Sequence, residues 1–160
     1  MEAFYQTVST FCFTLLGLWW AVVQLRHSEW TSDVTWRRMA YSVHLSFLVP
    51  GVMSLGAQTA GEIKIIWRLV FVASCALAVL GLVFLARARP LTPYRGWFLR
   101  HGRWLTIGAY VIIAVVAFAP ELAQQLDPKL TALQIEGWLL TLVVMLGVSV
   151  AWDLLVEPKE

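Results

Sequence analysis

Five long apolar stretches alternate with short polar segments along the chain. They cover about residues 4–25, 39–58, 65–86, 104–120 and 135–156. A helix needs about 20 mainly apolar residues to cross the hydrocarbon core of a bilayer, and each stretch comes close to that length. The runs are continuous and lack the alternation of period two that is typical of a membrane β-barrel. The pattern therefore predicts an all-α protein built as a bundle of five transmembrane helices.

The composition agrees with this fold class. Hydrophobic residues make up 59% of the chain and charged residues 14%, whereas a soluble domain is about 45–50% apolar and about 25% charged. These values exclude a soluble globular protein, and they exclude a soluble nucleic-acid-binding protein, which needs a dense basic surface. The segments between the apolar stretches are too short for a second domain. We therefore expect residues 1–160 to form a single transmembrane domain.

The positions of the basic residues predict the orientation. Nine of the twelve lysines and arginines lie in the segments 26–38 and 87–103 or at the C-terminus. With five helices, these segments share one side of the membrane. Cytoplasmic loops are enriched in lysine and arginine, so the N-terminus is expected outside and the C-terminus inside. The excess of arginine over lysine and the many alanine, valine and leucine residues favour a multi-pass protein of the plasma membrane, specifically a bacterial cytoplasmic membrane.

Small and polar residues recur every three or four positions along the first apolar stretch. In lipid, small residues let helices approach closely, and threonine and glutamine can form hydrogen bonds between helices. We expect this row to face protein, either as a packing seam or as the lining of a pore, and we expect its helix to be central in the bundle. We call it the threonine row; its members are Ala3, Thr7, Thr10, Thr14, Gly17, Ala21 and Gln24.

The second apolar stretch contains Pro50 and Gly51 close to its middle. Proline lacks a backbone N–H and clashes with the preceding turn, so it predicts a kink. Broken helices line binding sites in some transporters, which makes this pair a candidate hinge. Proline and glycine are also common in ordinary transmembrane helices, where neighbouring groups satisfy the backbone.

Ionisable residues inside a membrane are costly and are candidates for function. At the cytoplasmic end, His44 and Asp153 are predicted at similar depth and form a candidate proton-carrying pair. At the other end, Arg68 is a candidate partner for Glu136, Glu62 or Glu121, in an ion site or a structural salt bridge. The alternative for the first pair is two unrelated residues, and for Arg68 it is a side chain that extends to water.

The segment after the third stretch interleaves arginines with aromatic and apolar residues. Basic residues next to a membrane helix attract anionic lipid headgroups, so these arginines are candidate headgroup contacts. The charge also has a simpler explanation, because arginine in this segment sets the orientation of the chain. The arginines are Arg87, Arg89, Arg95, Arg100 and Arg103.

The chain contains no catalytic signature of the HExxH, GxSxG or P-loop type. Cys12 and Cys75 lie inside apolar stretches and form no CxxC motif. We therefore expect no enzyme activity, no metal site and no cofactor. The predicted function is that of a small membrane subunit or accessory protein, which acts through helix–helix contacts within a homo-oligomer or with a larger membrane partner. The alternative is a small transporter or channel for an ion or small solute, proton-linked through His44 and Asp153.

Overall fold

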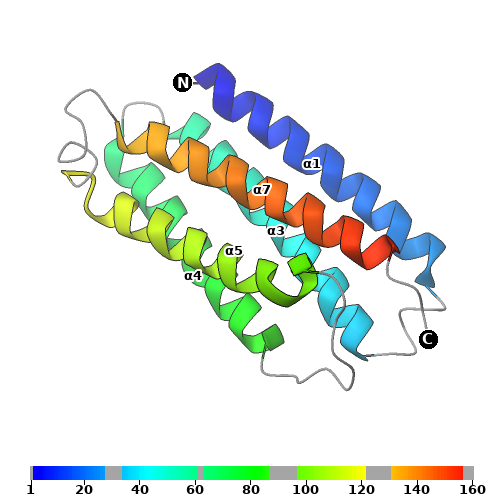
Figure 1. The fold of residues 1–160 in the computed structure, drawn as a ribbon. Coiled ribbons are helices and arrows are strands. Elements are labelled where there is room, and N and C mark those ends of the chain that lie inside the picture. Colours follow the sequence, from blue (N-terminus) through cyan, green and yellow to red (C-terminus); the bar gives the residue numbers. More distant parts are fainter. Residues whose placement is uncertain (1, 28–33, 61–62, 87–96, 122–130, 157–160) are drawn as a thin grey trace.

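The computed structural model describes residues 2–27, 34–60, 63–86, 97–121 and 131–156. These residues form helices α1 (Glu2–Leu25), α3 (Val34–Thr59), α4 (Lys64–Ala86), α5 (Trp97–Phe118) and α7 (Ala132–Val156). Each of these five helices is long and apolar enough to span a membrane. The all-helical prediction is confirmed. The helices run side by side, and the two chain termini lie at opposite ends of the bundle (Figure 1).

Two helices begin earlier than the hydrophobic pattern predicts. Helix α3 begins at Val34 rather than near residue 39, and α5 begins at Trp97 rather than near residue 104. Both extensions contain arginines, which the pattern assigns to loops. Arginine is a good helix former, and its long stem can carry the charge away from an apolar surface. A charged first turn is therefore compatible with a helix that continues into an apolar run.

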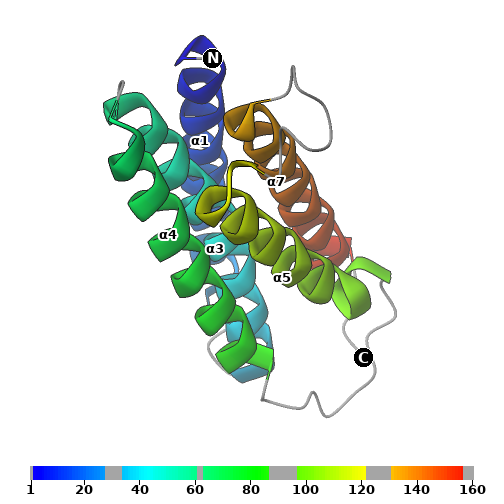
Figure 2. The ribbon, with the colours of Figure 1, turned by 90° about the vertical axis from the view of Figure 1, so that its left-hand side faces the viewer.

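Helix α3 lies at the centre of the bundle. It packs against α1, α4 and α7, while α5 packs against α4 and α7 (Figure 2). Of the membrane-length part of α3, 56% is buried, against 17% for α1. The expectation of a central first helix is therefore wrong. Helix α3 is also the least apolar of the five, and its polar side chains need protein neighbours more than those of the other helices.

Glycines allow the close packing around α3. A Cβ atom added to Gly147 of α7 would lie 2.8 Å from the Cβ atom of Ser46, and one added to Gly56 would lie 3.0 Å from the Cβ atom of Val70 on α4. Neither Ser46 nor Val70 can withdraw its Cβ atom without a shift of its helix backbone. Small residues thus let α4 and α7 approach the central helix closely.

The predicted hinge lies at the contact between α1 and α3. Helix α3 is continuous through Pro50, which is fully buried. A Cβ atom on Gly51 would lie 3.2 Å from the Cβ atom of Cys12 on α1 and 3.3 Å from the ring of Phe13. Gly51 therefore serves close packing against α1. A hinge motion at this pair stays a prediction.

Candidate functional site

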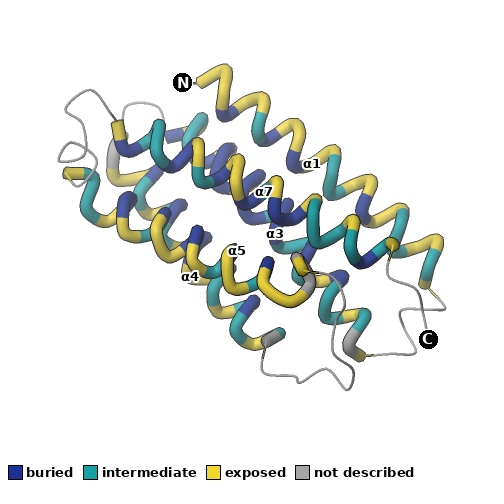
Figure 3. The backbone as a smooth tube through the Cα atoms, viewed as in Figure 1, coloured by how far each residue is buried: buried dark blue, intermediate teal, exposed yellow. Residues whose placement is uncertain are grey.

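The threonine row lies on the exposed side of α1. This helix buries the opposite face, which carries Tyr5, Ser9, Cys12 and Trp19 (Figure 3). Because 3.6 residues make one turn, Thr7 points almost directly away from Tyr5. Among the described residues the row neither packs against another helix nor lines a pocket, and a contact with another protein stays a prediction. The whole row is exposed: Ala3, Thr7, Thr10, Thr14, Gly17, Ala21 and Gln24.

The hydroxyl groups of this row are satisfied within α1. Thr7 donates a hydrogen bond to the carbonyl of Ala3 at 2.8 Å, and Thr14 donates to the carbonyl of Thr10 at 2.8 Å. Thr10 donates in the same way to the carbonyl of Gln6 at 2.9 Å. The three threonine hydroxyls of the row therefore have no free donor and can only accept a further hydrogen bond.

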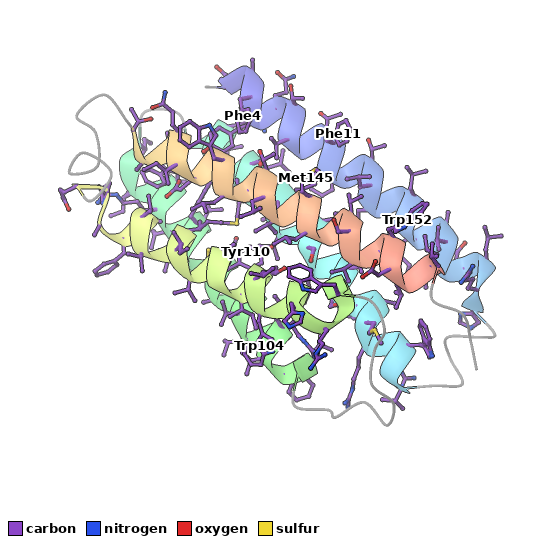
Figure 4. The ribbon with its side chains drawn as sticks, viewed as in Figure 1. Phe4, Phe11, Trp104, Tyr110, Met145 and Trp152 are labelled. Atoms are coloured by element: carbon purple, nitrogen blue, oxygen red, sulfur yellow. The ribbon has the colours of Figure 1, made fainter. Side chains whose placement is uncertain are left out.

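The outward faces of the other peripheral helices have a different character. They present large aliphatic and aromatic side chains, as expected for surfaces that meet lipid tails. Met145 on α7 shows the size of such a side chain, and α1 also exposes large side chains, such as Phe11, beside the row (Figure 4). The threonine row is therefore unusual within the molecule. The exposed residues compared are Leu69, Leu77, Leu80 and Phe84 on α4, Val111, Ile112, Val115 and Phe118 on α5, and Trp138, Leu142, Met145 and Val148 on α7.

A second candidate site is the carboxyl group of Glu136, which is fully buried near the start of α7. Neither carboxyl oxygen has a hydrogen-bond partner among the described residues. The group lies within electrostatic range of Tyr5 on α1 and of Arg68 and Cys75 on α4. The hydroxyl of Tyr5 instead donates to the carbonyl of Leu133 at 2.7 Å. We call Tyr5, Arg68, Cys75 and Glu136 the Glu136 cluster.

The structure brings the predicted pair Arg68 and Glu136 near each other without a direct hydrogen bond. The guanidinium of Arg68 lies over the ring of Trp67, 5.8 Å from its centroid, and the buried Nε atom of Arg68 has no partner. Tyr110 on α5 is fully buried, its hydroxyl also lacks a partner, and it lies within electrostatic range of Cys75 (Figure 4). Buried polar groups without a hydrogen-bond partner lower the stability of a fold. These groups are therefore candidates for a role other than packing.

The structure does not place His44 beside Asp153. The imidazole ring of His44 lies 5.5 Å from the ring of Trp20 on α1 and 5.6 Å from that of Tyr41, measured between centroids. His44 lines a pocket between α1 and α3, and Asp153 is not part of its lining. The residues of α3 that pack towards the end of α7 are Val43 and Phe47. The sequence predicts similar depth for the two residues, but His44 lines the pocket between α1 and α3, and a proton-carrying role for the pair stays a prediction.

The predicted headgroup arginines fall into two groups. Arg87, Arg89 and Arg95 lie outside the described residues. Arg100 is exposed on α5, whereas Arg103 donates a hydrogen bond of 3.4 Å from Nη1 to the carbonyl of Leu85. Leu85 belongs to the last turn of α4, whose carbonyls have no partners within the helix. Arg103 therefore caps α4, a structural role that the charge pattern alone did not reveal.

Cys12 and Cys75 are buried free thiols, so no disulfide joins them. Among the described residues, no group of three or more histidine, cysteine, aspartate or glutamate side chains is placed to hold a metal ion. The two structural features that stand out are the exposed threonine row and the buried Glu136 cluster. Comparisons with protein families, with characterised proteins and with solved structures find no match to this chain.

Proposed function

We propose that this chain is a multi-pass membrane subunit that acts through helix–helix contacts made by the threonine row of α1. All five helices cross the membrane, with the N-terminus outside and the C-terminus inside, as the distribution of arginines favours. A bacterial cytoplasmic membrane is the location that the composition favours. The observation that carries the proposal is the exposure of the threonine row on α1, where only 17% of the residues in the membrane-length part are buried.

The small residues of the row favour contact with another helix. Association of helices in a membrane depends on close van der Waals packing, and small residues provide it. Gly17 and Ala21 form a small-xxx-small pair on the row, and the space around Gly17 is open, with no atom within 4 Å of an added Cβ. Phe11 and Leu18, which are 63% and 61% exposed, flank the row. Because seven residues make about two turns, both lie on the same side of the row, and a partner helix seated on the row would pack beside them.

Replacing Gly17 with leucine is expected to abolish the assembly while leaving the bundle folded. The added side chain meets nothing within the chain, but it prevents a second helix from approaching closely. Native mass spectrometry of protein extracted gently from its own membrane measures the result. The wild type is expected as a defined complex with a second copy or another membrane protein, and the Gly17→Leu variant as the monomer of 18.0 kDa.

Gly108 provides a matched control on α5. It is also an exposed glycine with nothing within 4 Å of an added Cβ, but it lies outside the threonine row. Gly108→Leu is expected to retain the wild-type complex. If the two leucine variants behave alike, whether both retain or both lose the complex, the threonine row is not the contact surface.

A small proton-linked transporter is the second candidate function. The buried and unpartnered carboxyl group of Glu136 favours it, because an ionisable group inside a membrane span often marks an ion or proton pathway. This function predicts a pH-dependent flux in liposomes that Glu136→Gln abolishes and His44→Ala leaves intact. If the flux instead depends on His44 and not on Glu136, the proton site lies at the cytoplasmic end of the bundle.

A further inference from the structure

Two pockets flank the start of α3. The first lies between α1 and α3, has a volume of about 220 Å³ and is walled by Trp19, Trp20 and Tyr41. His27, Arg37 and His44 contribute the charged or polar part of its lining. A pocket of mainly apolar walls with a few polar groups is the usual form of a small-molecule site.

The second pocket lies on the other side of the same helix, between α3 and α4. Its volume is about 440 Å³, and its apolar walls include Leu45, Phe84 and Leu85. Arg37 and Tyr41 line both pockets, and Arg38 lines the second. The two pockets therefore share Arg37 and Tyr41, Arg38 lies beside the second, and one apolar recess lies on either side of α3.

The fixed charges that line the two pockets are positive. They belong to Arg37 and Arg38, and among the described residues no aspartate or glutamate is part of either lining. The arginines also lie close to the beginning of α3, at Val34. The N-terminus of a helix carries partial positive charge and unpaired N–H groups, both of which favour a phosphate. Guanidinium groups bind phosphate through two parallel hydrogen bonds.

We propose that this site binds one anionic diacyl phospholipid. The phosphate lies on Arg37 and Arg38, and the two acyl chains occupy the recesses on either side of Tyr41. The proposal rests on membrane insertion as stated under Proposed function, but it is independent of any assembly through α1. A zwitterionic choline headgroup fits less well, because the arginines repel its ammonium group.

Native mass spectrometry of the full-length protein tests the proposal. The protein in detergent micelles is titrated with phosphatidylglycerol, lysophosphatidylglycerol, phosphatidylcholine or glycerol phosphate, each in a separate experiment. The expected result is one retained phosphatidylglycerol per chain. Each charge near a membrane surface is worth about 1 kcal/mol, or about fivefold in affinity, so Arg37→Gln with Arg38→Gln is expected to weaken binding more than tenfold.

The controls separate a built site from diffuse attraction. Arg100→Gln removes an exposed arginine of α5 that the sequence makes a candidate headgroup contact but that lines neither pocket; a site at Arg37 and Arg38 requires that this variant change binding by no more than about twofold. The double lysine variant at Arg37 and Arg38 keeps the charge and is expected to restore most of the affinity. The lysolipid, with one chain, is expected to bind more weakly than phosphatidylglycerol.

Several outcomes would overturn the proposal. Equal retention of phosphatidylcholine and phosphatidylglycerol would remove the role of charge. An equal loss with Arg100→Gln would show unspecific attraction, and glycerol phosphate that binds as tightly as phosphatidylglycerol would remove the role of the two recesses. A monomer that retains one phosphatidylglycerol would support the lipid site even where the assembly proposed for α1 fails.

Discussion

Replacing Gly147 with valine is expected to lower the free energy of unfolding by about 3 kcal/mol, the upper part of the range for overpacked cores. The new Cβ atom would lie 2.8 Å from the Cβ atom of Ser46 and 3.1 Å from the ring of Phe47. Valine adds two further methyl groups at this point. Because Ser46 is fixed within the central helix, α3 and α7 must separate along part of their contact.

Unfolding in mixed detergent, followed by circular dichroism, measures this loss for Gly147→Val. Gly108→Val is the matched control, because it makes the same exchange on a helix surface where nothing lies within 4 Å of the added Cβ. A surface exchange of this kind is expected to change the free energy of unfolding by about 0.5 kcal/mol or less. Equal effects of the two variants would show that α7 does not approach α3 as closely as described.

Replacing Glu136 with leucine is expected to raise the free energy of unfolding by about 1–3 kcal/mol. The carboxyl group is fully buried and neither oxygen accepts a hydrogen bond, so the wild-type protein bears the cost of removing it from water. Leucine has a similar size and no polar atom. Because neither oxygen has a partner among the described residues, the exchange breaks no hydrogen bond and removes the cost of burying a polar group.

Glu136→Gln separates the loss of polarity from the loss of charge. The amide keeps the shape of the side chain but remains polar and unpartnered, so this variant is expected to gain less stability than Glu136→Leu. A decrease in stability with leucine would mean that the carboxyl group has a partner in the folded protein. An increase would agree with a polar group that is retained for function at the expense of stability.

The helices could be predicted from the sequence because apolar runs of membrane length leave few other structures. The helix starts at Val34 and Trp97 could not, because arginine in a first helical turn has the same hydrophobic pattern as arginine in a loop. The central position of α3 was missed for a different reason. The small residues of α1 and the polar residues of α3 both indicate protein contact, and only packing decides which of them lies inside the chain.

The candidate sites were predictable in part. Arg68 and Glu136 were paired by depth, and the structure brings them within electrostatic range without a direct hydrogen bond, so an ion site or a salt bridge between them stays a prediction. His44 and Asp153 were paired by the same reasoning, but depth does not fix the direction in which a side chain leaves its helix. The pockets beside Tyr41 are formed by residues from α1, α3 and α4, so no single segment of the sequence carries their signal.

Photo-crosslinking in intact membranes tests whether the threonine row contacts another protein. A photoreactive amino acid is placed at Thr14 on the row or, as a control, at Val115, an exposed residue of α5. If the row contacts another protein, Thr14 gives a protein adduct of defined mass and Val115 gives none. Mass spectrometry of the adduct then identifies the partner as a second copy or another protein. The absence of an adduct from Thr14, or the same adducts from both positions, would show that the threonine row is not a specific contact surface.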